Sequence, residues 1–235
     1  MKYQAILFDL DGTLLPMDND EFTKVYFGLL AKKAAPYGYQ LESLVPALWK
    51  GVKAMVMNDG TRTNKDAFWE VFAQIFGQQA YDHIPVFDDF YTHEFHGAAA
   101  FTGKNPLAVK AVALAREKAE KVVLATNPLF PPDGVATRLS WVDLKPEQFD
   151  HWTHYENSSH CKPNPEYYKD ILKEIGLEAD KCLMIGNDAR EDVQAAYAVG
   201  MDAFLVTDCL IDRGNRPACK QGSFTELITF LEGLE

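Results

Sequence analysis

Apolar residues occur along this chain in two patterns: short continuous runs, and longer stretches in which they recur every three or four positions. The short runs have the length and apolar content of buried strands. They lie at residues 5–8, 121–127, 181–185 and 202–206, and residues 149–155 form a further short candidate. We therefore predict a sheet of about five strands.

Stretches with helical spacing separate these runs. In the second half of the chain they predict helices at residues 105–119, 135–142, 163–175, 190–199 and 224–234. Strands that alternate with helices form βαβ units, whose strands run parallel in one sheet. The predicted fold class is α/β, with a doubly wound parallel sheet.

Residues 21–95 differ from the rest because they contain no convincing strand pattern. Apolar side chains recur there at helical spacing, as in the aromatic stripe Phe68, Phe72 and Phe76, which we interpret as core. This indicates a bundle of about four helices inserted after the first strand, with residues 97–103 as the hinge out of it. The predicted domains are residues 1–15 together with 97–235, and residues 16–96.

Composition narrows the possible partners. The 235 residues are 47% hydrophobic and 24% charged, which is ordinary for a soluble globular protein. The formal net charge of -11 disfavours binding to a nucleic-acid backbone or an anionic membrane surface. It also disfavours an anionic small substrate unless local cations override it, and it indicates no particular oligomeric state.

Targeting and redox features favour the cytoplasm. The N-terminus shows no basic segment followed by a long apolar one, and no apolar run is long enough to span a bilayer. The four cysteines have no CxxC spacing, so we expect reduced and mostly buried thiols. They are Cys161, Cys182, Cys209 and Cys219.

Polar residues follow three of the predicted strands directly. They are Asp9 and Asp11, then Thr126 and Asn127, and then Asn187 and Asp188, while Lys162 precedes a helix in a loop. The carboxyl ends of parallel strands meet at one edge of the sheet, so we expect these groups to gather there. Two neighbouring carboxylates in a dry site need a cation or a proton between them.

Each of these fragments also fits a purely structural role. The Asp-Leu-Asp-Gly stretch could be a turn that closes a strand, with Gly12 allowing the sharp bend. Lys162 could be a solvated loop lysine, and Asp188 could cap a helix. Their joint appearance in one order is what favours a functional site.

In that order the fragments resemble the four motifs of the haloacid dehalogenase-like (HAD) hydrolase superfamily. The motifs lie at residues 8–14, 125–127, 162–165 and 185–188, with Asp192 one turn after the last. The resemblance covers most of the chain and implies a Rossmann-like core. The helical insertion resembles the cap that one large branch of the family carries after its first motif.

The resemblance implies a role for each motif residue. Asp9 is implied as the nucleophile, which needs no base because a carboxylate is already ionised at neutral pH, and which becomes an aspartyl-phosphate. Asp11 is implied as the general acid on the leaving oxygen and then as the general base for water. Thr126 and the Asn127 backbone would bind phosphoryl oxygens, and Lys162 would neutralise charge.

The resemblance further implies Mg²⁺, which prefers oxygen ligands. The implied ligands are the Asp9 side chain, the Asp11 backbone carbonyl and a carboxylate of the fourth motif. Many members carry Gly-Asp where this chain has Gly186-Asn187, so we expect Asp188 to supply that carboxylate. Asp192 is expected to orient Lys162 or a water on the metal.

Asp11 also discriminates between reactions within the family, because its dehalogenases and phosphonatases typically lack this second aspartate. It points to a phosphatase that hydrolyses a small phosphorylated metabolite. Two alternatives stay open: a sugar-phosphate mutase, and a non-catalytic module that binds a phosphorylated ligand or a protein.

Other polar residues give weaker indications. The pairs His93/His96 and His151/His154 lack a third ligand in pattern, which disfavours zinc. Arg213, Arg216 and Lys220 are interpreted as solvated loop residues that could serve an anionic substrate. Several polar residues of the insertion could contact a substrate, with no basis for choosing among Lys24, Lys53, Asn58 and Arg62.

Overall fold

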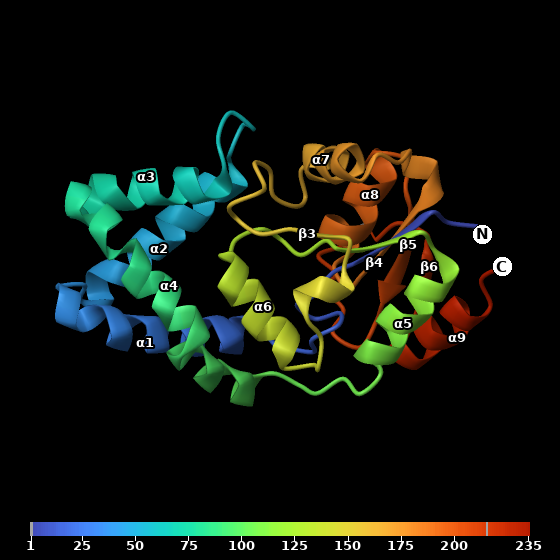
Figure 1. Ribbon diagram of the computed structural model, residues 1–235, viewed down its shortest axis with the longest axis horizontal. Coiled ribbons are helices and arrows are strands. Elements are labelled where there is room, and N and C mark those ends of the chain that lie inside the picture. Colours follow the sequence, from blue (N-terminus) through green and yellow to red (C-terminus); the bar gives the residue numbers. More distant parts are fainter. Residues whose placement is uncertain (1, 215) are drawn as a thin grey trace.

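The computed structural model describes residues 2–214 and 216–235 and contains one sheet of six parallel strands (Figure 1). The strand order is β3-β2-β1-β4-β5-β6, so β1 lies in the middle. The prediction of an α/β parallel sheet is confirmed. The strands are β1 (Ala5–Phe8), β2 (Lys121–Leu124), β3 (His151–Trp152), β4 (Cys182–Gly186), β5 (Asp202–Val206) and β6 (Lys220–Gly222).

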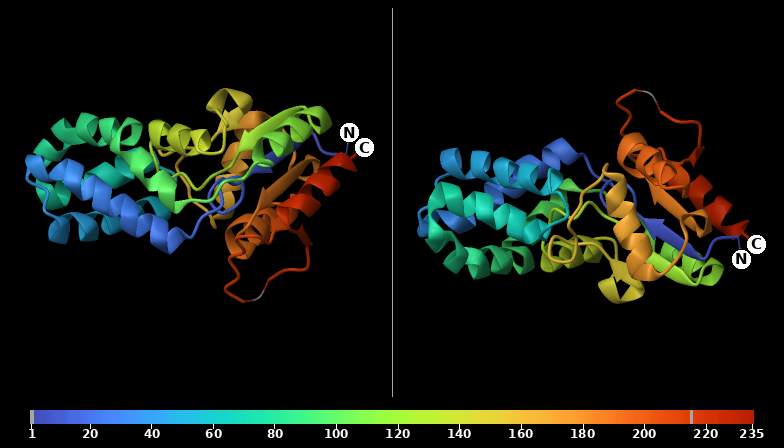
Figure 2. Two further views of the ribbon diagram at one scale, coloured as in Figure 1. Left: turned by 90° about the horizontal axis from the view of Figure 1, so that it is seen from below. Right: turned by 90° about the horizontal axis from the view of Figure 1, so that it is seen from above.

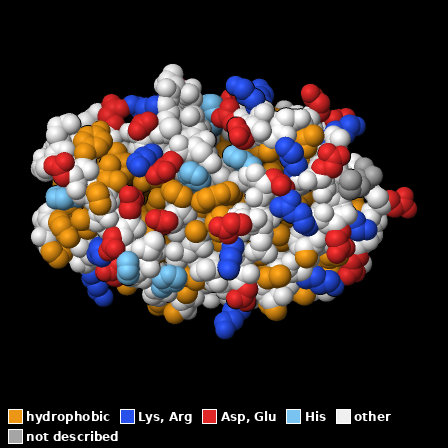
Figure 3. Space-filling view, viewed as in Figure 1, with side chains coloured by type: hydrophobic (Ala, Val, Ile, Leu, Met, Phe, Trp, Pro, Cys, Tyr) orange, Lys and Arg blue, Asp and Glu red, His pale blue; other side chains and the backbone are white. Residues whose placement is uncertain are grey.

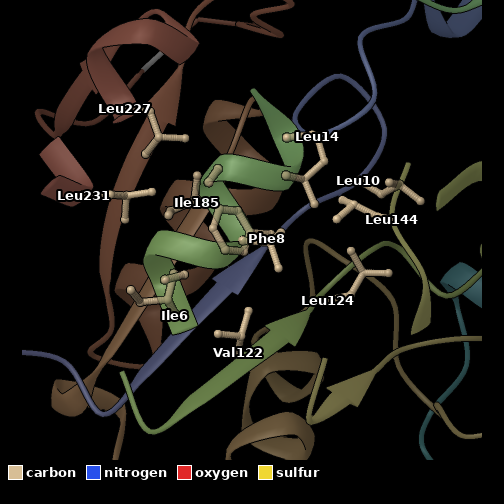
Figure 4. Packing of buried hydrophobic residues seen from close by; sticks show 14 of the residues in the cluster. Ile6, Phe8, Leu10, Leu14, Val122, Leu124, Leu144, Ile185, Leu227 and Leu231 are labelled. Atoms are coloured by element: carbon tan, nitrogen blue, oxygen red, sulfur yellow. The ribbon is translucent and has the colours of Figure 1, made fainter. Parts of the chain in front are cut away.

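Helices cover both faces of this sheet because alternate residues of β1 point to opposite sides. Ala5 and Leu7 pack against α7 (Pro165–Ile175) and α8 (Ala195–Ala198). Ile6 and Phe8 pack on the other face, against α5 (Ala108–Lys118) and α9 (Phe224–Glu232), as Figure 4 shows. Fully burying a side chain such as Phe8 contributes about 1.5–3 kcal/mol to folding.

The segment between β1 and β2 is helical, as predicted, and projects from one end of the sheet (Figure 2). We call residues 19–101 the helical insertion. Its own core is rich in aromatic side chains such as Phe72, Phe90 and Phe95, and hydrophobic side chains also gather on its surface (Figure 3). Its elements are α1 (Asn19–Ala34), η1 (Ala35–Tyr37), α2 (Leu41–Val56), α3 (Asn64–Phe76), η2 (Gln78–His83), α4 (Ile84–Thr92) and η3 (Glu94–Phe101).

The exit from the insertion differs from the predicted irregular hinge. Residues 97–101 belong to the 3-10 helix η3, because Phe95 and Ala98 are drawn into the core of the insertion. The two segments that connect the insertion to the rest of the chain meet just beyond η3. Met17 and Thr102 form an antiparallel bridge, and the Gly103 N–H donates to the Pro16 carbonyl at 2.6 Å.

Several boundaries also differ from the prediction. Helix α6 (Pro132–Ser140) begins three residues early, since Pro132 is well suited to the first turn of a helix. Residues 189–194 form a π-helix, η6 (Ala189–Gln194), which shortens α8. Strand β6 was not predicted because its sequence lacks an apolar pattern, and Lys220 therefore lies on an edge strand rather than in a loop. Two further 3-10 turns are η4 (Pro146–Gln148) and η5 (Ala179–Lys181).

None of the helices formed by the residues described above is long and apolar enough to cross a membrane. The four cysteines are free thiols. Cys161 and Cys182 are buried, and burial raises the pKa of each to about 12, whereas Cys209 and Cys219 are partly exposed. The expectation of mostly buried thiols thus holds for two of the four.

This difference predicts the outcome of a thiol titration. At pH 8 the native protein is expected to react with Ellman's reagent at two cysteines, because the raised pKa of Cys161 and Cys182 leaves almost no thiolate there and burial blocks access of the reagent. All four thiols should react in guanidinium chloride. Rapid reaction of four thiols in the native protein would contradict the burial of Cys161 and Cys182.

Candidate active site

The residues predicted from the ends of three strands line one cavity of about 250 Å³ at the carboxyl edge of the sheet. Strand β1 leads into Asp9, β2 into Thr126 and β4 into Asn187. The structure therefore brings together side chains that lie far apart in sequence. The predicted residues on this cavity are Asp9, Asp11, Thr126, Asn127, Lys162, Asn187, Asp188 and Asp192.

A tight loop after β1 fixes the two first-motif aspartates. The Gly12 N–H donates to the Leu15 carbonyl at 2.7 Å, and the Leu15 N–H donates to the Leu10 carbonyl at 2.9 Å. Gly12 has a φ of +86°, and a Cβ there would lie 2.2 Å from Asn187 Nδ2. Only glycine satisfies both constraints, so the loop can close directly against the end of β4.

Lys162 forms the centre of a buried charge cluster. Its Nζ donates to Asp9 Oδ1 at 2.8 Å and to Asp192 Oδ1 at 2.7 Å, and its side chain is 1% exposed. Burial opposes the charge of this ammonium, but Asp192 and Asp9 outweigh it and hold the pKa of Lys162 well above its ordinary value. The lysine therefore stays protonated beside Asp9.

Asp9 is only 7% exposed. Burial raises the pKa of Asp9, and the nearby Asp192 and Asp11 add to this effect, while Lys162 opposes it. The second carboxylate oxygen of Asp9 accepts a long hydrogen bond of 3.3 Å from Thr13 Oγ1. Additional positive charge near Asp9 would thus favour its ionised form.

Asp188 holds its position through both of its carboxylate oxygens. Oδ1 accepts from the backbone N–H groups of Arg190 and Glu191 at 2.8 and 3.0 Å, which caps η6. Oδ2 accepts from Arg213 Nη1 at 2.5 Å. Asp188 therefore combines the capping role with a place on the cavity wall.

The side-chain amide of Asn187 is occupied by hydrogen bonds to the Thr13 hydroxyl and to the backbone. Its Oδ1 accepts from Thr13 Oγ1 at 3.1 Å, and its Nδ2 donates to the Cys209 carbonyl at 2.7 Å. Asp192 Oδ2 accepts from the Asp188 N–H at 2.9 Å, so Asp192 links the fourth motif to Lys162. A Cβ on Gly186 would lie 2.2 Å from Asp192 Cγ, which explains the glycine at the end of β4.

The residues after β2 present polar atoms without partners. Thr126 Oγ1 is buried and has no hydrogen-bond partner among the described residues, and the same is true of Asn127 Oδ1. Asn127 Nδ2 donates to Glu191 Oε2 at 3.2 Å. Because buried polar groups are normally satisfied, the Thr126 hydroxyl marks a place for a polar ligand.

Asp11 pairs with an arginine that the sequence patterns did not indicate. Arg138 lies on α6 with no exposed surface, and its Nη1 donates to Asp11 Oδ2. Its Nε donates to the Gly134 carbonyl at 3.1 Å, and its guanidinium lies 3.9 Å from the centroid of the Phe130 ring. Asp11 Oδ1 is buried and has no partner among the described groups.

Sequence reasoning missed two further charged residues around this cavity, Arg138 and Glu191. Glu191 lines the cavity, and burial together with Asp188 raises its pKa to about 7. It follows Asp188 closely in sequence, which is the only local hint of its position. Arg213, interpreted as a solvated loop residue that could serve an anionic substrate, is half exposed and lies on the cavity wall.

The four polar insertion residues considered from sequence do not line the cavity. Asn58 bonds to Asn64 and the Arg62 carbonyl, and Arg62 pairs with Glu70 on the surface. Lys24 and Lys53 are exposed. The insertion instead contributes Asn19, Phe22 and Thr23, and the segment that connects it to β1 contributes Met17.

The donor set around Asp9 fits a hard cation. Asp9 and Asp188 bring carboxylates to the same cavity, and Asp11 lines it as well. No group of three His, Cys, Asp or Glu side chains suited to holding a metal occurs in the described part of the chain. Oxygen donors that include backbone and water suit Mg²⁺, which needs few protein carboxylates.

Comparison with known proteins connects this sequence to a family. The sequence model of the haloacid dehalogenase-like hydrolases matches residues 3–200. A HAD phosphatase from Thermococcus onnurineus has a TM-score of 0.61 at 20% identity over 99% of each chain. Magnesium-bound YfnB from Bacillus subtilis has a TM-score of 0.61 at 16% identity, over 99% of this chain and 100% of that chain. At these identities the structural likeness concerns the fold alone.

A shorter match connects the chain to a curated enzyme. The phospholysine phosphohistidine inorganic pyrophosphate phosphatase of Bos taurus is 47% identical over 45 residues. These residues make up 19% of this chain and 17% of that protein, so the chain matches about a sixth of the length of this relative.

Proposed function

This chain belongs to the haloacid dehalogenase-like hydrolase family, and from that membership we propose that it is a phosphatase that hydrolyses monoesters of small phosphorylated metabolites. One observation carries the proposal. A carboxylate paired with a buried lysine, a second aspartate held by a buried arginine and an unpartnered threonine hydroxyl share one cavity. The short match to a phosphatase of Bos taurus supports it.

The proposed reaction has two steps. An oxygen of Asp9 attacks phosphorus, the bond between phosphorus and the ester oxygen breaks, and the leaving alcohol takes a proton from Asp11. Asp11 then accepts a proton from a water that attacks phosphorus, the bond between phosphorus and the Asp9 oxygen breaks, and inorganic phosphate leaves with Asp9 restored. Arg138 holds one oxygen of Asp11, which leaves the unpartnered Oδ1 for this proton.

Other residues make the approach of two anions tolerable. Lys162 lies 2.8 Å from the Asp9 carboxylate and would also neutralise charge on the phosphoryl group. The Thr126 hydroxyl and the Asn127 backbone N–H would donate to phosphoryl oxygens. Asp192 keeps Lys162 in place through its 2.7 Å hydrogen bond.

Mg²⁺ would be held by the Asp9 side chain, the Asp11 backbone carbonyl and Asp188. When bound, it would supply positive charge that offsets the repulsion between the Asp9 carboxylate and the phosphoryl oxygens. In this structure the Arg213 guanidinium supplies positive charge at Asp188, with Nη1 2.5 Å from Oδ2. The magnesium-bound YfnB structure supports this choice of cation.

Residues 16–96 would act as a cap domain over this cavity. Phe22 and Thr23 of α1 already form part of its wall. A cap that closes over the phosphoryl group excludes bulk water and strengthens every charge interaction inside. The cap is also the part of the chain that would select the organic group of the substrate.

The proposal predicts a dependence on added metal. With p-nitrophenyl phosphate and Mg²⁺ we expect steady release of phosphate, which EDTA should lower about 10²-fold or more, because charge stabilisation by the metal is worth several kcal/mol. Excess Mg²⁺ should restore the rate. A screen of phosphorylated metabolites under the same conditions tests the substrate class.

The same screen separates the alternatives. Isomerisation of a sugar phosphate without net phosphate release would identify a mutase. Binding of phosphorylated compounds with no turnover of any ester would identify a non-catalytic module and overturn the proposed hydrolysis.

A further inference from the structure

A second cavity, of about 170 Å³, lies within the helical insertion and borders the candidate active site. Its walls come from helices α1–α4, from the loop after β2 and from Tyr155 after β3. We call it the apolar chamber, defined by the lining residues Phe27, Leu48, Val52, Trp69, Phe87 and Phe130. Thr23, Leu129 and Phe130 line both this chamber and the active-site cavity, so the two spaces share a boundary.

The apolar chamber offers few groups to a polar ligand: besides the Thr23 and Tyr155 hydroxyls, the buried Trp69 Nε1–H has no partner among the described residues, and the lining is otherwise largely apolar. The Tyr26 and Tyr91 hydroxyls in its wall bond to each other at 2.6 Å. Asp88 is its one charged lining residue within the described chain, and it is only half-buried. A sugar hydroxyl moved from water into such a space would lose hydrogen bonds with little replacement, which is costly. The Asp88 carboxylate also disfavours a second anionic group on the ligand.

The size and the walls of the chamber suit a small aromatic group. An apolar cavity of about 150 Å³ lined by aliphatic and aromatic side chains stays dry and binds benzene. The chamber is of this size, and side chains such as Phe27, Trp69 and Phe87 surround it. The Phe130 ring reaches both cavities and is held by the Arg138 guanidinium 3.9 Å from its centroid. Arg138 therefore positions both Asp11 and the Phe130 ring at the boundary of the chamber.

We propose that the apolar chamber receives the uncharged, apolar organic group of a phosphate monoester, about one aromatic ring in size, while its phosphoryl group lies at Asp9. This inference rests on the proposed phosphatase function and names its substrate class. Hydrolysis would then release inorganic phosphate and an apolar alcohol, which departs with the proton from Asp11.

The first test compares two substrates in Mg²⁺. Benzyl phosphate and glycerol 1-phosphate both release primary alcohols, so their intrinsic reactivities are similar and their organic groups differ. We expect kcat/KM for benzyl phosphate to exceed that for glycerol 1-phosphate at least about 30-fold, because only the benzyl group gains from apolar burial.

A matched pair of variants on α2 locates this preference. Val52 lines the chamber, whereas Val56, one turn later, does not and is 38% exposed. Val52→Phe should fill part of the chamber and lower kcat/KM for benzyl phosphate about 10-fold or more, with glycerol 1-phosphate changed less than about twofold. Val56→Phe should change neither, and thermal melts verify that both variants fold.

A binding measurement keeps this inference separate from the proposed function. Benzyl alcohol should alter the fluorescence of Trp69 and Trp49, which both line the chamber, and Val52→Phe should weaken this binding. Hydrolysis of both esters with no preference and no effect of Val52→Phe would overturn the inference and leave the phosphatase proposal standing. Binding of benzyl alcohol without hydrolysis of any ester would support the chamber as a site and overturn the phosphatase proposal. Neither binding nor turnover would overturn both.

Discussion

Replacing Asp9 by Asn is expected to lower kcat for p-nitrophenyl phosphate on the order of 10⁴-fold or more, as the loss of a nucleophile does in other enzymes. The amide has nearly the same shape and can still accept from Lys162 Nζ, now 2.8 Å from Oδ1. Its oxygen, however, attacks phosphorus poorly. The loss should therefore appear in kcat rather than in the affinity for phosphate esters.

The fold should survive this substitution. Burial raises the pKa of Asp9, which means that its ionisation costs folding free energy. Asn carries no charge, and Lys162 keeps Asp192 as its partner at 2.7 Å. We expect the melting temperature of the variant in metal-free buffer to be no lower than that of the parent.

Asp82→Asn makes the same change of carboxylate to amide on an exposed residue of η2 and serves as the control. It should leave both kcat and the melting temperature unchanged. If Asp9→Asn retained more than a tenth of the parent kcat, the nucleophile would have to be another residue of the cavity.

The sequence predicted most of the sheet because the central strands are buried on both faces. Residues 5–8 and 182–186 are fully buried and occur as continuous apolar runs. Polar residues placed directly after such strands must lie at the carboxyl edge, which is why Asp9, Thr126 and Asp188 could be grouped. The strand order and the short edge strand β6 leave no comparable pattern, since 220–222 reads Lys-Gln-Gly.

The partners of these residues could not be predicted in the same way. Arg138 lies 127 positions after Asp11 and occupies a short helix whose pattern gives no reason to bury an arginine. Its role depends on how α6 packs between the sheet and the insertion. Glu191 could not be predicted for a related reason. A π-helix rather than an α-helix follows Asp188, and this changes which side chains face the cavity.

Arg138 itself leads to the second large effect. Arg138→Met should lower the free energy of unfolding by about 3 kcal/mol, the lower end of the cost of breaking a buried ion pair, because the side chain of its partner Asp11 is 25% exposed. In a chain of this length the melting temperature should fall roughly 6–12 °C. Arg116→Met breaks a surface pair with Asp150 and should cost about 0–1 kcal/mol.

If Arg138 positions Asp11 for proton transfer, its replacement should also change the kinetics of ester hydrolysis. In that case kcat/KM of Arg138→Met, which covers the steps up to departure of the alcohol, should fall about 10²-fold for benzyl phosphate, whose leaving alcohol needs a proton. The loss for p-nitrophenyl phosphate should be under about 10-fold, because nitrophenolate departs without one. The double variant Asp11→Asn/Arg138→Met should regain about 1 kcal/mol of stability relative to Arg138→Met, since no carboxylate is then left unpaired. Equal losses of kcat/KM for the two esters would instead assign Arg138 a purely structural role, because a general packing defect does not distinguish between leaving groups.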